Sequence, residues 1–194
     1  KLVEKQGTGR QTGKTMYYLK TLAPFHSEKE DVQIYVDDGK ANPEEIVRQL
    51  WIYKLINYYG YDKSEIALEK PVTFGTDSTT RYADIIVYTN NTKTTPKIVL
   101  EIKKPKRKDG IEQLRSYLNA EGSPIGVWSN GSDKVILYRS YPRDFDALPE
   151  IPRKGQSAED LQVAQLTLAH LEKSFNFKKN STRPRRAGSR FIWR

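Results

Sequence analysis

The sequence predicts an α/β fold, in which helices and strands alternate through one core between residues 42 and 141. Three observations lead to this prediction. A helical pattern of apolar residues begins at Asn42, residues 81–88 and 97–103 alternate between apolar and polar side chains as half-buried strands do, and a second helical pattern covers residues 111–120. A chain of 194 residues has room for one domain of ordinary size with extensions.

Residues 1–41, which we treat as an N-terminal extension, give mixed signals. Lys14–Leu22 is expected to form a short helix and Val32–Val36 a strand, which a turn at residues 37–39 follows.

Residues 7–15 resemble a phosphate-binding P-loop. That motif would place its first glycine at position 8, which is Thr8, and it needs a core strand before the loop. Too few residues precede the segment to supply such a strand, so nucleotide binding is not expected there.

The signals become sharper at Asn42, where a long helix is expected to begin. Asn42 is a favourable N-cap, Pro43 suits the first helical position, and Glu44 and Glu45 lie at the positive end of the helix dipole. Gly60 is expected to end the helix. Its apolar stripe comprises Ile46, Val47, Leu50, Trp51, Leu55 and Ile56.

Three extended segments are expected next. Residues 66–70 form the first strand, and a turn at residues 73–80 leads to the second strand at 81–88. On this second strand Asp84 lies on the face opposite Ala83, Ile85 and Val87. On the third segment, residues 97–103, one face carries Ile98, Leu100 and Ile102, and the other carries Lys97, Val99, Glu101 and Lys103.

A helix over residues 111–120 and strands at 124–128 and 135–138 complete the expected core, which spans residues 42–142. The inward positions of the helix are Ile111, Leu114 and Leu118. The pattern alone does not settle the order of the strands in the sheet.

A loop and a last helix are expected over residues 143–175. The helix begins at Ser157, where Ser157 and Asp160 resemble a capping box, and it ends near Phe175. Residues 176–194 are expected to be a basic, disordered tail.

The net charge of +9 is unevenly distributed. Residues 173–194 carry eight basic and no acidic side chains, whereas residues 1–172 are nearly neutral, with 25 basic and 24 acidic side chains. The tail has an alternative interpretation as a solvated chain end. A second basic cluster directly follows a predicted strand, where a phosphate backbone could approach. It consists of Lys103, Lys104, Lys106, Arg107 and Lys108.

Composition excludes several classes of site. The chain contains no cysteine, which excludes disulfides, Cys-ligated zinc, iron–sulfur clusters and thiol nucleophiles. Its two histidines, His26 and His170, are far apart and lack metal-ligand spacing. No apolar run is long enough for a membrane span and no signal peptide opens the chain, so we expect a soluble, cytoplasmic protein without a membrane partner.

Asp84, Glu101 and Lys103 are polar groups on otherwise apolar strands. Glu101 and Lys103 share a face, and pairing of the two strands would bring Asp84 beside them. Two carboxylates suit Mg²⁺ or Mn²⁺, and a lysine beside them suits phosphodiester hydrolysis. The alternative is a solvated strand with alternating charges. Gln113 and Tyr117 share one face of the next helix, where they are either part of such a site or an ordinary surface pair.

Together, Asp84, Glu101-Ile102-Lys103 and Gln113-Leu-Arg-Ser-Tyr117 resemble the PD-(D/E)xK nuclease superfamily, in the RecB-like branch with a QxxxY motif. Four further segments resemble the N-terminal nuclease domain of type I restriction enzyme R subunits, which also heads some fused restriction–modification polypeptides. They are Asn42–Gln49, Tyr59–Tyr61, Val99–Pro105 and Gly126–Gly131. The resemblance spans residues 25–152.

This resemblance implies a restriction-endonuclease-like core, with a mixed central sheet flanked by helices. It implies that Asp84 and Glu101 are metal ligands, helped by the carbonyl of Ile102, and that Lys103 is the catalytic lysine. Gln113 and Tyr117 would support DNA placement or the geometry of the site. The acidic residue of the first helix maps to Glu45, with Glu44 as the other candidate. Ala83 stands where the literal motif has proline.

By this resemblance we expect a Mg²⁺-dependent endonuclease domain that acts on double-stranded DNA, with contacts from Lys104, Lys106, Arg107 and Lys108. Specificity and methyltransferase subunits would be its partners. ATP would act only through motor domains, which 194 residues cannot hold, so the chain would be a fragment or a free-standing module. Two alternatives stay open: a non-catalytic DNA-binding or subunit-docking domain, and a nuclease directed at RNA or single strands.

Overall fold

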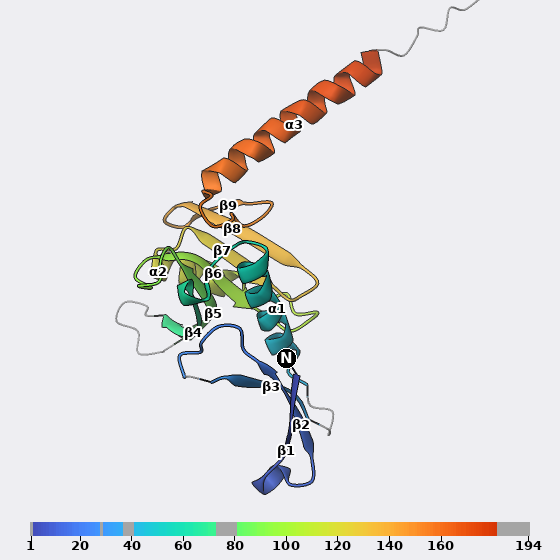
Figure 1. Cartoon of the computed structure of the whole chain (residues 1–194). Coiled ribbons are helices and arrows are strands. Elements are labelled where there is room, and N and C mark those ends of the chain that lie inside the picture. Colours follow the sequence, from blue (N-terminus) through green and yellow to red (C-terminus); the bar gives the residue numbers. More distant parts are fainter. Residues whose placement is uncertain (1, 28, 37–40, 73–80, 182–194) are drawn as a thin grey trace, which may run out of the picture.

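The computed structural model describes residues 2–27, 29–36, 41–72 and 81–181. A six-stranded sheet in the order β4-β5-β6-β7-β8-β9 forms its centre (Figure 1). The strands of this sheet are β4 (Ile66–Val72), β5 (Arg81–Tyr88), β6 (Pro96–Ile102), β7 (Ile125–Ser129), β8 (Lys134–Tyr141) and β9 (Asp144–Ala147). The helices are α1 (Pro43–Asn57), α2 (Ile111–Glu121) and α3 (Ala158–Ser181), with short 3-10 turns at Gly9–Gln11 and Lys63–Glu65.

The central sheet is mixed, which confirms the expected α/β architecture. β6 and β7 run parallel and are joined by the crossover helix α2, while the other neighbouring strands of this sheet are antiparallel. Side chains of α1 pack against one face of the sheet, in the cluster that includes Ile85 and Leu100. Side chains of α2 pack against the other face, in the cluster that includes Val99. Burial on both faces explains why these strands are so apolar.

Helix α1 begins where the sequence predicts. The Asn42 side chain accepts a hydrogen bond from the Glu45 amide at 3.4 Å, and Pro43 occupies the first turn. The predicted stripe is partly wrong, because Ile46 and Leu50 are exposed and Ile52 is fully buried instead. The helix itself ends at Asn57, three residues before Gly60.

The N-terminal region forms a second, three-stranded antiparallel sheet of β1 (Leu2–Gln6), β2 (Thr15–Lys20) and β3 (Asp31–Val36). The prediction of a helix at Lys14–Leu22 is therefore wrong, since this segment pairs with strands on both sides. Its aromatic and β-branched residues favour such pairing. The P-loop-like segment, residues 7–15, follows β1 and leads into β2 rather than into an α-helix. The predicted turns at residues 37–39 and 73–80 lie outside the described residues.

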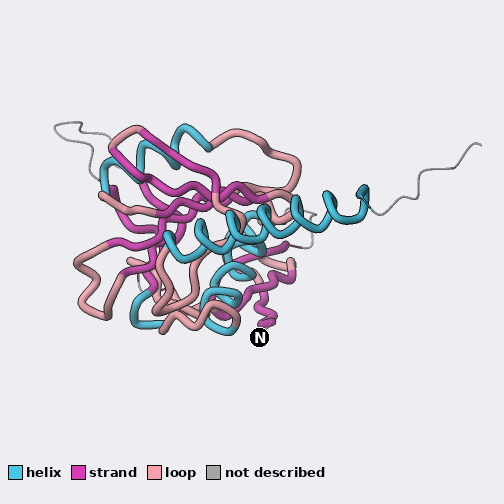
Figure 2. The backbone as a smooth tube through the Cα atoms, turned by 90° about the horizontal axis from the view of Figure 1, so that it is seen from above, coloured by secondary structure: helices cyan, strands magenta, loops and turns pink. Residues whose placement is uncertain are grey.

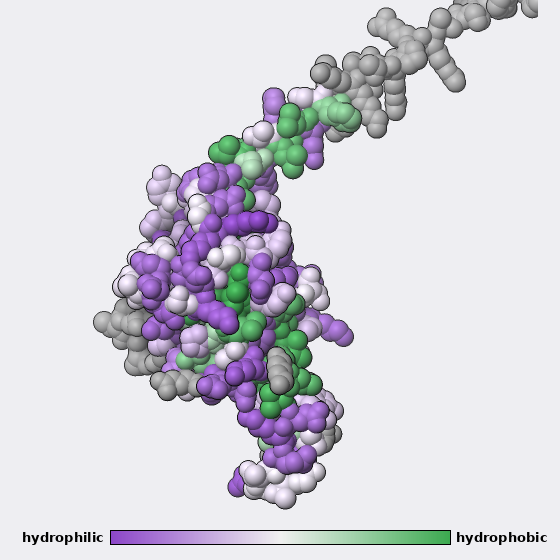
Figure 3. Space-filling view, in the orientation of Figure 1, coloured by the Kyte–Doolittle hydropathy of each residue, from purple (hydrophilic) through white to green (hydrophobic). Residues whose placement is uncertain are grey.

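The C-terminal part contains one strand that the sequence analysis missed. β9 pairs with β8 at the edge of the sheet, and although its Asp-Phe-Asp-Ala sequence alternates, it is only four residues long and three of them are exposed. The capping box of α3 is confirmed, because the Ser157 and Asp160 side chains each accept the other residue's amide proton. Figures 1 and 2 show α3 extending away from the sheet, and Figure 3 shows apolar side chains along it. No helix among the described residues has both the length and the apolar character of a membrane span.

Candidate active site

The polar residues singled out from the sequence meet where β5 and β6 lie side by side. Asp84 is on β5, Glu101 is near the end of β6, and Lys103 directly follows that strand. Oδ2 of Asp84 accepts a hydrogen bond from the amide of Ile102 at 2.8 Å, and Glu101 Oε1 forms an ion pair with Lys103 Nζ. The structure thus brings the three residues together as their alternation predicts.

Glu101 is the most deeply buried of these groups, with 1% of its side chain exposed. Its second carboxylate oxygen, Oε2, is buried and has no hydrogen-bond partner among the residues that the structure describes. Burial, together with the charges of Asp84 and Glu44, raises the pKa of Glu101 to about 7, although the contact with Lys103 opposes the shift. At neutral pH this carboxyl group is therefore poised between its charged and neutral forms.

Substitution of Glu101 by glutamine is expected to stabilise the fold above pH 7. The pKa of Glu101 rises from 4.5 to about 7 on folding, so its contribution to stability is complete below pH 4.5 and is lost as the pH rises through 7. The gain in unfolding free energy from Glu101→Gln should therefore be about 3 kcal/mol larger at pH 8 than at pH 4.5. Urea denaturation across this range measures it.

The matched control is Glu112→Gln, at a carboxylate on α2 that is 82% exposed. For this control, the difference in unfolding free energy between variant and wild type should not grow with pH in the same way. If that difference were the same at all pH values for Glu101→Gln, the buried Glu101 would not lose its proton in the folded state as proposed.

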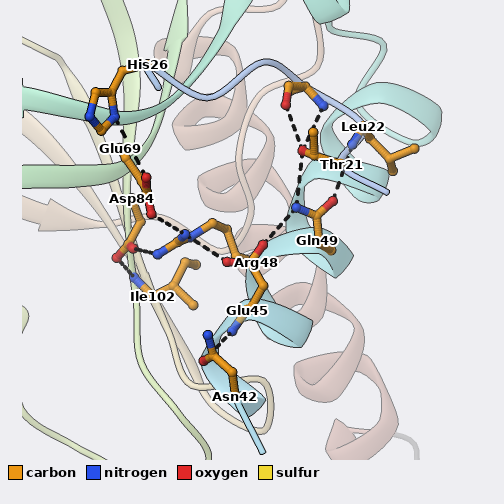
Figure 4. A network of polar contacts seen from close by, with 11 residues as sticks. Thr21, Leu22, His26, Asn42, Glu45, Arg48, Gln49, Glu69, Asp84 and Ile102 are labelled. Atoms are coloured by element: carbon orange, nitrogen blue, oxygen red, sulfur yellow. Dashed lines mark hydrogen bonds and ion pairs between the residues drawn. The ribbon is translucent and has the colours of Figure 1, made fainter. Parts of the chain in front are cut away.

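Arg48 of α1 bridges the helix to Asp84 (Figure 4). One guanidinium nitrogen, Nη2, donates to Asp84 Oδ1 at 2.5 Å, and the other, Nη1, donates to Glu45 Oε2 at 2.8 Å and to Glu69 Oε1 at 3.2 Å. Burial lowers the pKa of Arg48, but the charges of Asp84, Glu45 and Glu69 outweigh it and raise the pKa. The guanidinium is therefore a permanent cation at the centre of three carboxylates.

Glu69 joins this network from a point where β4 is irregular. Its φ of +49° lies in the left-handed region, and the pairing of β4 with β5 passes from Leu68 to Lys70 without it. The side chain of Glu69 contacts Arg48 and also lies 3.7 Å from Nδ1 of His26.

The two acidic residues at the start of α1 lie in different surroundings. Glu45 is buried and holds Arg48 and Gln49, the latter through a 2.9 Å hydrogen bond to Oε1, so Arg48 stands between Glu45 and Asp84. Burial raises the pKa of Glu45, against the opposing charge of Arg48. Glu44 is half-buried, and its charge raises the pKa of both Glu101 and Lys103. Glu45 therefore acts on the part of the site around Arg48, and Glu44 acts on the part around Glu101 and Lys103.

Gln113 and Tyr117 contact each other on α2. Gln113 Nε2 donates to Tyr117 Oη at 2.5 Å, and Tyr117 Oη donates to the carbonyl of Tyr82 at 3.2 Å. Burial raises the pKa of Tyr117. The pair therefore fixes the start of β5, two residues before Asp84, and Tyr117 is a buried residue of the core.

The basic turn after β6 presents exposed side chains from Lys104, Lys106 and Lys108. Arg107 is also exposed, but its guanidinium makes two 2.5 Å hydrogen bonds to the carboxylate of Asp109, which lower the pKa of Asp109 to about 2. The three lysines are thus the cations of this turn that are presented to solvent most directly.

Five residues that support the site were not identified from the sequence. Besides Arg48 and Glu69, they are Trp128 and Asn130, whose side chains donate to the carbonyls of Asp109 and Arg107 and so hold the basic turn against the end of β7. The fifth is Gly110, at φ +105°, where an added Cβ would lie 2.8 Å from Cε of Lys103. The i, i+3 spacing of Glu45 and Arg48 is the one signal that could have revealed any of them.

Residues 43–152 match the family model described as type I restriction enzyme R protein N terminus (HSDR_N). The chain belongs to this family. The part that matches this R protein N-terminal domain contains α1, the whole central sheet and α2, and therefore every residue of the candidate site. The matched range, residues 43–152, begins later than the range of the resemblance seen in the sequence, residues 25–152, and ends at the same residue. Neither a curated protein nor a solved structure matches the chain.

Proposed function

We propose that this R protein N-terminal domain is a metal-dependent endonuclease that hydrolyses phosphodiester bonds of double-stranded DNA. The observation that carries the proposal is the buried oxygen Oε2 of Glu101, which lacks a hydrogen-bond partner and belongs to a carboxylate beside Asp84. A buried carboxylate oxygen without a partner is costly for the fold, and such groups are retained where they bind something.

The donor set fits Mg²⁺ or Mn²⁺. Both ions prefer carboxylate oxygens, and Mg²⁺ commonly uses only one or two of them and keeps other positions for water and substrate phosphate. No group of three or more acidic, histidine or cysteine side chains poised for a metal occurs in the described part of the chain, which fits a site with two protein carboxylates. Asp84 and Glu101 would hold the ion. When bound, it would polarise the scissile phosphate and lower the pKa of a water molecule.

Lys103 is proposed to orient the attacking water or to stabilise the charge that develops on the phosphate. Burial lowers the pKa of Lys103, but its contact with Glu101 outweighs burial and raises the pKa, so the ammonium group stays protonated at neutral pH. A fixed positive charge at this position stabilises a transition state whose negative charge increases.

DNA is proposed to approach along the basic turn, where the side chains of Lys104, Lys106 and Lys108 are exposed. Such contacts to phosphates set affinity and position, and they carry no sequence information. Sequence recognition would then come from the specificity and methyltransferase subunits of a restriction–modification complex, as membership of the family suggests.

Isothermal titration calorimetry with MgCl₂ and MnCl₂ tests the proposal without relying on activity. We expect one divalent-ion site in the wild-type chain, and at least about tenfold weaker binding after Glu101→Gln, because loss of even an outer-shell partner costs 10–100-fold in metal affinity. The Glu112→Gln variant should bind as the wild type does. Absence of a divalent-ion site, together with DNA binding that EDTA leaves unchanged, would favour a non-catalytic DNA-binding or docking domain instead.

A further inference from the structure

Two aromatic rings are stacked at the edge of the candidate active site. The rings of His26 and Tyr82 have centroids 5.3 Å apart and planes inclined by 26°. They come from distant parts of the sequence, since Tyr82 lies on β5 and His26 follows β2. The bridge between Phe25 and Leu68 places the segment of His26 beside β4. Tyr82 is 46% exposed and the His26 side chain 41%, so both rings offer surface to a ligand.

The rings line the same cavity as the carboxylate of Asp84. This cavity has a volume of about 280 Å³, close to the lower end of the range for small-molecule sites, and its other lining residues are Arg48, Glu69 and Ala83. A planar group bound against the rings would therefore lie directly beside the proposed metal ligand. Figure 4 shows His26 and Asp84 on either side of Glu69.

The backbone of Tyr82 and the ring of His26 each contact the rest of the site. The backbone carbonyl of Tyr82 accepts the hydrogen bond from Tyr117 Oη, and the His26 ring lies 3.7 Å from the Glu69 carboxylate, which in turn holds Arg48. These contacts place the ring pair beside Asp84, with the two rings supporting each other through their stacking.

We propose that the His26–Tyr82 pair is a stacking subsite for an unpaired nucleobase next to the phosphate that is cut, an inference that rests on the proposed nuclease function. A base within a duplex is covered on both faces by its neighbours, so it cannot stack on a protein ring unless it is displaced. Aromatic rings beside a backbone-binding groove accept bases of separated strands without sequence preference. The preferred substrate is therefore double-stranded DNA whose strands are locally separated at the phosphate that is cut, such as a fork.

Binding of the full 194-residue chain to two DNAs in EDTA tests this subsite without cleavage. One DNA is a fork with 2-aminopurine in its unpaired arm, and the other is a blunt duplex of the same length. We expect Tyr82→Leu to weaken fork binding by about 5- to 140-fold, the loss of one base–aromatic stack, and to leave duplex binding unchanged. Tyr82→Phe should retain fork binding and the quenching of 2-aminopurine that stacking produces.

The matched control is Tyr141→Leu, at an exposed tyrosine at the end of β8, which should bind both DNAs as the wild type does. Circular dichroism establishes that Tyr82→Leu is folded. The subsite is overturned if folded Tyr82→Leu binds the fork as tightly as Tyr82→Phe, or loses as much affinity for the duplex as for the fork. The DNA-binding test is done in EDTA, so its outcome does not depend on the divalent-ion site that calorimetry measures. The stacking subsite and the metal site can therefore each be refuted separately.

Discussion

Asp84→Asn is expected to lower metal-dependent DNA cleavage by at least about 10³-fold while the domain stays folded. The substitution removes the charge of one of the two proposed metal ligands, and electrostatic and metal contributions to phosphoryl transfer are worth several kcal/mol. Asparagine still offers its one oxygen to the amide of Ile102, and Arg48, which loses its bond to Asp84, keeps its bonds to Glu45 and Glu69, so the domain should still fold at some cost in stability. Cleavage of a supercoiled plasmid by the complete R protein, with circular dichroism of the domain, measures both effects.

Lys103→Met should reduce cleavage to a similar degree, because its ammonium group is the proposed electrostatic partner of the reaction. Two variants outside the candidate site serve as controls: Asp146→Asn on β9, and Lys134→Met, whose lysine pairs with Glu150 on the surface. Both should cut at the wild-type rate. Wild-type cleavage by either Asp84→Asn or Lys103→Met would remove these residues from the proposed mechanism.

Arg48→Met is expected to lower the free energy of unfolding by about 3–5 kcal/mol at pH 7. Methionine fills a similar volume but leaves the carboxylates of Glu45 and Asp84 buried without the cation that they share, and removal of one partner from a buried ion pair costs this much. The pKa of Glu45 is already raised by burial, and the charge of Arg48 opposes that rise. The loss should therefore shrink toward pH 5 as the carboxyl groups protonate. Urea denaturation at both pH values measures it.

Arg115→Met provides the comparison for Arg48. Arg115 forms an i, i+3 ion pair with Glu112 on the surface of α2, and exposed pairs of this kind contribute about 0–1 kcal/mol. If Arg48→Met costs no more than Arg115→Met, the network around Arg48 does not stabilise the fold. Double-mutant cycles with Asp84→Asn would then show no coupling between Arg48 and Asp84.

The grouping of Asp84, Glu101 and Lys103 could be predicted from the sequence. On a strand, side chains two residues apart share a face, so Glu101 and Lys103 were placed together. Pairing between their strand and the strand of Asp84 was then expected to bring Asp84 beside them. The start of α1 was also predictable, because capping depends on local residues such as Asn42 and Pro43. Membership of the R protein family agrees with the motifs that these residues form.

The contacts of Arg48 could not be predicted in the same way. An arginine on a helix pattern is usually solvated, whereas Arg48 is buried among carboxylates from three different elements, one of which, Glu69, lies where β4 is irregular. In the N-terminal sheet, β3 was predicted as a strand over Val32–Val36, whereas β1, β2 and β9 were missed. These three strands are short and mostly exposed or half-buried, so pairing between backbones contributes more to them than burial of an apolar face.

The ion network around Arg48 also bears on the order in which ligands can arrive. The groups of the site that are joined by ion pairs comprise the carboxylates of Glu45, Glu69, Asp84 and Glu101, and the cations of Arg48 and Lys103. When all are ionised, this ion-paired cluster carries a net charge of −2, and the half-buried carboxylate of Glu44 adds to its negative charge. A DNA phosphate that approaches the cluster alone meets net repulsion in a medium of low dielectric constant. Electrostatics therefore favours entry of the cation before the DNA backbone, or together with it.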